Sequence, residues 1–93
     1  MTDPLDRRDE IVRLAATHGA SNLRVFGSSA RRERHERSDL DLLVRMEEGR
    51  SLLDLVALSQ ELEDVLGVHV DVLSEGGLSP YLRDRILGEA VPL

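Results

Sequence analysis

The stretch from residue 39 to residue 73 constrains the fold most, because it places one helix between two short apolar strands. Residues 39–46, DLDLLVRM, have the composition and alternation of a strand. Residues 52–66 carry apolar side chains at helical spacing, and Gly67 follows as a natural end. Residues 68–73, VHVDVL, form the next strand candidate. A helix of this length suits a crossover connection, so the sequence predicts that the two strands run parallel.

The remaining segments complete a small mixed domain. Residues 5–18 and 80–90 have helical spacing, residues 22–26 form a short strand candidate, and residues 29–36 are typical of a short polar helix. The connection between the first two strands is short, so these strands could run antiparallel. We therefore expect an α/β (α+β) fold, one domain over residues 1–93, with a mixed β-sheet of about three strands and flanking helices.

Composition narrows the function classes. The chain has 93 residues, a formal net charge of −6 and no cysteine. No disulfide or thiolate metal site is therefore expected, and the acidic balance argues against bulk nucleic-acid binding. No apolar run suits a signal peptide or a membrane span. We expect a cytoplasmic protein that binds neither nucleic acid nor membrane directly, with an open groove rather than an enclosed pocket.

Three aspartates fall on the two strands of the predicted parallel pair. Side chains two residues apart along a strand point the same way, so Asp39 and Asp41 share one face, and Asp71 lies on the next strand. If these strands are neighbours, the three carboxylates come close, repel one another and favour a divalent cation. Oxygen ligands suit Mg²⁺, with Mn²⁺ as an alternative, and paired ions are the usual apparatus of phosphoryl chemistry.

Each of these residues also has an ordinary structural interpretation. An isolated pair such as Asp39 and Asp41 is usually a solvated strand end or a cap. Asp71 interrupts a β-branched run that predicts a central, buried strand, where an unpaired carboxylate is rarely tolerated. Its structural alternative is a pair with an arginine. His69 shares the predicted face of Asp71, and we interpret it as a partly exposed histidine in preference to a residue that lines a groove.

Gly27 and Ser28 follow the first strand candidate and open the predicted polar helix. Backbone N–H groups at such a turn attract phosphate, and glycine allows close approach. Alone the pair is a weak signal, because Ser28 could be a plain N-cap and the chain has neither a P-loop nor a dinucleotide-binding glycine pattern. Arg31, in the arginine-rich stretch that follows, either neutralises pyrophosphate or belongs to a solvated helix face.

The combination GSSARRERHERSDLDLLV with the later VHVDVL resembles the minimal nucleotidyltransferases, a branch of the DNA polymerase β-like superfamily. Their pattern is Gly-Ser-x-Ala-Arg, a short polar stretch, Ser-Asp-x-Asp-Leu-x-Val and a later strand aspartate. The matching positions are Gly27, Ser28, Ala30, Arg31, Ser38, Asp39, Asp41, Leu42 and Val44. Arg32 stands where many members have glycine, which bears on the helix shape and nearby nucleotide contacts and not on the metal chemistry.

The resemblance implies a Mg²⁺-dependent nucleotidyltransferase with the polymerase β-like fold. By family analogy Asp39 and Asp41 bridge two metal ions, and Asp71 binds the catalytic ion and can take the acceptor proton. All three aspartates would then be both catalytic residues and metal ligands. Gly27, Ser28 and Arg31 would bind the triphosphate of ATP.

Members of this family are commonly paired with HEPN-type ribonuclease toxins. The resemblance therefore implies an antitoxin that neutralises such a toxin by transferring AMP from ATP to one of its tyrosines. One alternative is a non-catalytic antitoxin that masks its toxin by binding, a role that does not need three aspartates. Another is a nucleotidyltransferase acting on a small molecule, but such enzymes generally carry an extra substrate domain for which this chain has no room. An acidic surface would suit a basic, RNA-cleaving partner.

Overall fold

The computed structural model describes residues 7–27 and 40–93. Its helices are α1 (Arg8–Thr17), α3 (Leu52–Leu66) and α4 (Pro80–Glu89), with a short 3-10 helix, η2 (Glu75–Gly77). Its strands are β1 (Ala20–Val25), β2 (Leu40–Met46), β3 (Val70–Ser74) and β4 (Val91–Pro92). The polar helix predicted over residues 29–36 lies outside the described residues. Within the described ranges, no helix is both long and apolar enough to cross a bilayer.

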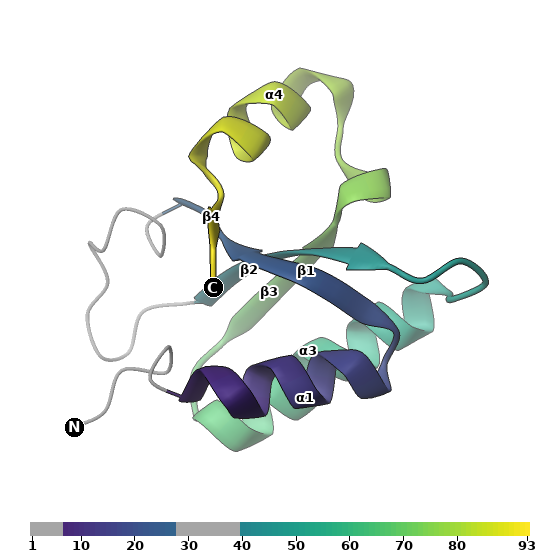
Figure 1. Ribbon diagram of the computed structural model, residues 1–93, viewed down its shortest axis with the longest axis vertical. Helices are drawn as coiled ribbons and strands as arrows, with labels where there is room; N and C mark the ends of the chain where they lie inside the picture. Colours follow the sequence, from purple (N-terminus) through teal and green to yellow (C-terminus); the bar gives the residue numbers. More distant parts are fainter. Residues whose placement is uncertain (1–6, 28–39) are drawn as a thin grey trace.

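The strands form one mixed sheet in the order β3-β2-β1-β4 (Figure 1). The pairing of β2 with β3 is parallel, as the crossover helix α3 predicts, and β1 pairs antiparallel with β2. Strand β4 is one more than the sequence predicts, and it pairs antiparallel with β1. It is too short for a periodic pattern and contains a proline, which is unusual inside a sheet. The predicted α/β fold is confirmed with this addition.

Capping residues define both ends of helix α3. The Ser51 hydroxyl accepts a hydrogen bond from the Leu53 backbone N–H at 3.2 Å, and the Asp54 carboxylate accepts one from the Ser51 N–H at 2.9 Å. The bond from the Ser51 backbone lowers the pKa of Asp54 below its ordinary value. Gly67 ends the helix with a left-handed backbone, φ +73°. These contacts fix the crossover that brings β3 beside β2.

Replacing Ser51 with alanine should lower the free energy of unfolding by about 1 kcal/mol, because a donor of the first helical turn loses its partner. Urea denaturation measures the change. Ser59→Ala is the matched control, since the Ser59 hydroxyl donates to the Val56 carbonyl of its own helix and alanine favours the helix interior. Equal losses in the two variants would contradict a capping role for Ser51.

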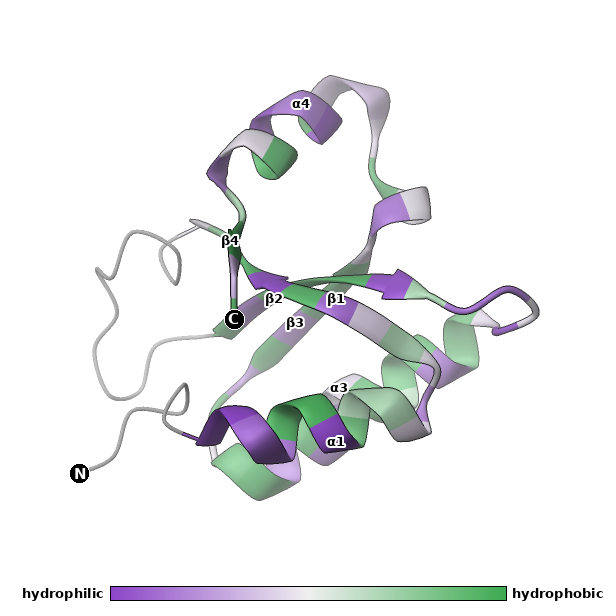
Figure 2. Cartoon of the chain, viewed as in Figure 1, coloured by the Kyte–Doolittle hydropathy of each residue, from purple (hydrophilic) through white to green (hydrophobic). Residues whose placement is uncertain are grey.

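The main hydrophobic core lies between the sheet and the helices α1 and α3, which cover the same face (Figure 1). Much of α3 is hydrophobic (green in Figure 2), and its Leu58 and Leu62 are completely buried. On β2 the core-facing side chains are Leu40, Leu42 and Val44, as alternation predicts. The full buried cluster comprises Ile11, Ala15, Ala20, Val25, Leu40, Leu42, Val44, Leu58, Leu62, Val70 and Val72.

The opposite face of the sheet is covered only in part. Helix α4 lies on this side (Figure 1), and its Ile86 is buried, as is Leu43 of β2. Neither residue belongs to the main core. Because Leu43 is two residues after Asp41, both side chains lie on this second face. The second face is therefore apolar where α4 lies and polar toward the start of β2.

Candidate active site

Asp41 and Asp71 lie side by side on the second face of the sheet. They are direct partners in the parallel register of β2 and β3, and neighbouring strands lie about 4.8 Å apart. Their neighbours in sequence, Leu40, Leu42, Val70 and Val72, all point into the main core. Alternation therefore turns both carboxylates away from the core toward the same open side. The predicted juxtaposition of these two aspartates is what the structure shows.

The turn after β1 approaches the same place. The Phe26 N–H donates to the Asp41 carbonyl at 3.2 Å, which holds the end of β1 against the start of β2. Gly27 follows with φ +62°, a left-handed conformation that favours glycine. A Cβ atom at Gly27 would lie 3.0 Å from the Asp41 Oδ2 atom. Glycine is thus favoured by the backbone conformation, and its missing Cβ leaves room for the Asp41 carboxylate.

Three predicted site residues, Asp39, Ser28 and Arg31, lie outside the described residues. The structure brings together the other three, Gly27, Asp41 and Asp71. Within residues 7–27 and 40–93, no group of three or more acidic, histidine or cysteine side chains is arranged to hold a metal ion. A centre with three carboxylate ligands on this face would therefore need a residue beyond those ranges.

The environment of Asp71 differs from the sequence prediction. The β-branched run around it predicts a central, buried strand, but β3 is the edge strand of the sheet. The Asp71 side chain keeps 54% of its surface exposed. Val70 and Val72 both pack into the main core on one face of β3. Their β-branched side chains therefore do not require that the other face of the strand be buried as well. The prediction of a central strand was wrong, and the Asp71 side chain is open to solvent.

His69 contacts Asp71, which the sequence analysis did not assign. Its Nε2 atom lies 2.9 Å from the Asp71 Oδ1 atom, and its Nδ1 atom lies 2.6 Å from the Glu63 Oε2 atom of α3. The predicted partial exposure of His69 is confirmed at 56% of the side chain. The shared face with Asp71 was a visible signal, whereas the contact with Glu63 depends on how α3 packs and has no local signature.

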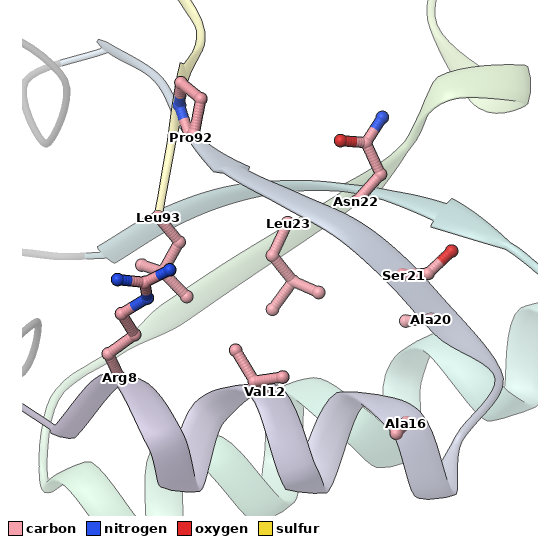
Figure 3. A pocket seen from close by; sticks show the side chains of 9 residues that line it. All are labelled: Arg8, Val12, Ala16, Ala20, Ser21, Asn22, Leu23, Pro92 and Leu93. Carbon is pink, nitrogen blue, oxygen red and sulfur yellow. The ribbon is translucent and has the colours of Figure 1, made fainter.

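A cavity of about 340 Å³ lies elsewhere, between α1, β1 and the C-terminal residues (Figure 3). Its lining is Arg8, Val12, Ala16, Ala20, Ser21, Asn22, Leu23, Pro92 and Leu93. No aspartate or glutamate side chain lines it, and α1 covers the sheet face opposite to the paired aspartates. This cavity is therefore separate from the candidate active site.

Comparison with known proteins decides the family. Residues 9–93 match the family defined as the nucleotidyltransferase domain. The chain belongs to the nucleotidyltransferase family. The match runs from the second residue of α1 through β4, so the paired aspartates and the Gly27 turn lie in the nucleotidyltransferase domain itself.

Two relatives narrow the family further. A Methanocaldococcus jannaschii protein, named provisionally as a protein adenylyltransferase, is 52% identical over 82 residues and covers 88% of each chain. The protein adenylyltransferase MntA of Thermococcus cleftensis is 40% identical over 73 residues, 78% of this chain and 74% of its own. The nucleotidyltransferase described here is thus similar to proteins that carry the name of adenylyltransferases.

Solved structures agree with this placement. One described provisionally as a minimal nucleotidyltransferase superposes with a TM-score of 0.85 at 54% identity, covering 99% of this chain and 97% of its own. A complex of a tri-AMPylated Shewanella oneidensis HEPN toxin with its MNT antitoxin gives a TM-score of 0.73 at 18% identity, covering 96% and 70%. At that identity the second match concerns the fold alone. The predicted resemblance to the minimal nucleotidyltransferases is confirmed.

Proposed function

We propose that this nucleotidyltransferase transfers AMP from ATP to a tyrosine hydroxyl of a HEPN-type ribonuclease toxin and so neutralises it as an antitoxin. The observation that carries the proposal is the pairing of Asp41 with Asp71 on an open sheet face beside the Gly27 turn. Two carboxylates and a glycine turn within reach of one another suit a metal–triphosphate complex.

The relatives support the type of group transferred and the class of acceptor. Two of them carry the name protein adenylyltransferase, and the chain covers at least 74% of each. The complex from Shewanella oneidensis pairs an MNT antitoxin of the same fold with an AMPylated HEPN toxin.

The residues present fit a divalent metal. Asp41 and Asp71 offer only oxygen atoms, the donors that Mg²⁺ and Mn²⁺ prefer. The missing Cβ at Gly27 leaves space directly beside the Asp41 Oδ2 atom. Asp39, Asp41 and Asp71 would together hold two Mg²⁺ ions. When bound, the ions would neutralise negative charge on the phosphates and on the departing pyrophosphate.

The chain's own groups would act on the nucleotide and on the acceptor. The Gly27 turn, with Ser28 and Arg31, would hold the triphosphate. The tyrosine oxygen forms a bond to the α-phosphorus of ATP, and the bond between the α-phosphorus and its bridging oxygen to the β-phosphate breaks. Pyrophosphate leaves, and the tyrosine proton passes to the Asp71 carboxylate. The exposure of Asp71 allows a protein side chain to reach it.

The AMP group attached to the toxin would explain how the toxin is neutralised. AMP on a tyrosine adds negative charge and bulk, and next to an RNA-cleaving site either would disfavour RNA binding. The net charge of −6 on the nucleotidyltransferase would also favour encounter with a basic, RNA-binding partner. Encounter of this kind should weaken as salt is added.

Incubation of the protein with its HEPN partner, ATP and Mg²⁺ should add one or more AMP units to the partner, as read by intact-mass spectrometry. Asp41→Asn should prevent the addition, because it removes a carboxylate from the transfer site. Asp64→Asn is the matched control: it removes the same charge from an exposed position on α3, a helix that packs on the opposite face of the sheet.

The alternatives give different results in the same assay. Full neutralisation of the partner by the Asp41→Asn protein, with no mass added by the wild type, would replace the enzymatic proposal with masking by binding. A mass addition to a small-molecule acceptor, with an unmodified partner protein, would replace it with a small-molecule nucleotidyltransferase.

A further inference from the structure

Glu63 is held in place by two elements at once. It belongs to the last turns of α3, and its Oε2 atom accepts a hydrogen bond from the Val70 N–H at 3.0 Å. Val70 opens β3, the edge strand, so this bond ties the end of the crossover helix to the strand that follows it. The same Oε2 atom lies 2.6 Å from the His69 Nδ1 atom. The Glu63 carboxylate is thus a fixed point against which the imidazole ring is oriented.

The imidazole ring carries this orientation to the candidate active site. Its second nitrogen, Nε2, lies 2.9 Å from the Asp71 Oδ1 atom. A planar ring with a carboxylate oxygen at each nitrogen has its rotation about the Cβ–Cγ bond restricted from both sides. In the described part of the chain, this ring is the polar group that holds the Asp71 carboxylate.

We propose that His69, held by Glu63, is a positioning residue that fixes the carboxylate of Asp71 for nucleotidyl transfer. The inference rests on the proposed function, because it assigns Asp71 to the metal and acceptor side of the site. The bond from His69 engages Oδ1 and leaves Oδ2 as the oxygen for the metal or for the acceptor proton. Asp71 thus offers a single oxygen in a fixed direction.

Asp71 needs such support more than Asp41 does. Asp41 lies on an inner strand between β1 and β3, with the Gly27 turn beside its carboxylate. Asp71 lies on the edge strand with a half-exposed side chain, and among the described strands only β2 lies beside it to restrict its rotation. A side chain that samples several rotamers presents the ligand oxygen for only part of the time, which weakens metal binding.

A second pair in the same protein provides the comparison. His18, at the end of α1, lies with its Nε2 atom 2.8 Å from the Glu61 Oε2 atom of α3. The two pairs share chemistry and share a helix, but His18 contacts none of the candidate site residues among its described partners. The variant His18→Asn therefore measures the structural effect of losing a histidine–glutamate contact while Asp71 is left unchanged.

The experiment measures Mn²⁺ affinity by electron paramagnetic resonance of the free ion, in the presence of the non-hydrolysable analogue AMP-PNP. In His69→Gln the amide nitrogen stands at the position of Nε2 and keeps the contact with Asp71. In His69→Asn it stands at the position of Nδ1 and keeps only the contact with Glu63. We expect His69→Asn to weaken Mn²⁺ binding by about tenfold, His69→Gln to retain most of the affinity, and His18→Asn to match the wild type.

Two further measurements separate positioning from a structural role. In an Asp71→Asn background, His69→Asn should cause no additional loss of Mn²⁺ affinity, since its effect acts through Asp71. In the transfer reaction, kcat should fall in His69→Asn while the KM for ATP changes little. Thermal melting should show folded protein for the His69 and Asp71 variants, because both side chains are exposed, His69 just before β3 and Asp71 within it.

Equal Mn²⁺ affinity in His69→Asn and the wild type would overturn the inference, as would tighter binding, which would make His69 a competitor of the metal. If His69→Asn lowered Mn²⁺ affinity by the same factor in the Asp71→Asn background as in the wild type, the role of His69 would be structural. If Asp71→Asn itself left Mn²⁺ affinity intact, the assignment of Asp71 in the proposed function would fail, and the positioning role would fail with it. A loss in Asp71→Asn without a loss in His69→Asn would overturn the positioning role alone.

Discussion

Asp41→Asn or Asp71→Asn should lower the rate of AMP transfer by at least about a thousandfold, or about 4 kcal/mol in activation free energy. Each substitution removes one carboxylate, a proposed metal ligand, from a pair that the parallel register of β2 and β3 places together. Asparagine keeps the size of the side chain, so the loss reflects charge and not shape. Single-turnover kinetics with saturating ATP and Mg²⁺ measures it.

Asp41→Asn should leave the metal-free protein folded, with equal or slightly higher stability. Two carboxylates on neighbouring strands repel each other without a cation, and losing one charge relieves that repulsion. Asp71→Asn should change stability little, because the same gain is offset by a weaker contact with His69. Calorimetry without metal tests this, with Asp64→Asn as the control for loss of an exposed charge on α3. A much lower melting temperature for Asp41→Asn would mean that the aspartate supports the fold, and the assigned role would be wrong.

Gly27→Ala should reduce transfer by about a hundredfold, with a stability loss of about 1 kcal/mol. The stability loss comes from a left-handed backbone, φ +62°, that alanine tolerates poorly. The rate loss comes from the new methyl group, which would lie 3.0 Å from the Asp41 Oδ2 atom and displace that carboxylate. Denaturation and single-turnover assays on the same preparation give both values.

Gly67→Ala separates the two causes. Gly67 has φ +73°, nearly the same backbone conformation, but a Cβ there would meet nothing within 4 Å. It should therefore show the stability loss without the rate loss. If both alanine variants transferred AMP at the wild-type rate, the close approach of Gly27 to Asp41 would have no catalytic importance.

Much of the fold could be predicted because its signals are local. Helix α3 spans the predicted residues, since Ser51 caps its start and Gly67 ends it. The inward faces of β2 and β3 follow from simple alternation. Their parallel pairing follows from the length of the helix between them.

Other parts of the fold depend on tertiary contacts that no local pattern encodes. β1 starts two residues earlier than predicted and carries an irregular register between Ser21 and Arg24, next to Asn22 with φ +50°. The edge position of β3 was missed because a run of valines also suits an inner strand. β4 has too few residues for any periodic signal and gains its conformation by pairing with β1.

The candidate site also contains residues that local sequence patterns predict and contacts that depend on tertiary packing. Asp41, Asp71 and Gly27 could be predicted because a strand pattern and a turn place them, and the register confirms that the two aspartates are neighbours. The positions of Asp39, Ser28 and Arg31 lie outside the described residues, and the roles of all six predicted site residues stay predictions. The contact between Glu63 and His69 joins residues whose approach depends on the angle at which α3 meets β3, so the sequence offers no pattern for it.

The proline in β4 affects how this molecule can associate with others. The Leu93 N–H donates inward to the Leu23 carbonyl at 3.1 Å, so the preceding position, Pro92, faces away from β1. Proline has no N–H to offer there, and an incoming strand would find no donor at that point. Across the sheet, the Val70 N–H of β3 is already engaged by Glu63. Addition of a strand from another molecule is thus disfavoured at Pro92 of β4 and at the start of β3, and at these two points we expect contacts with other molecules to be made through side chains.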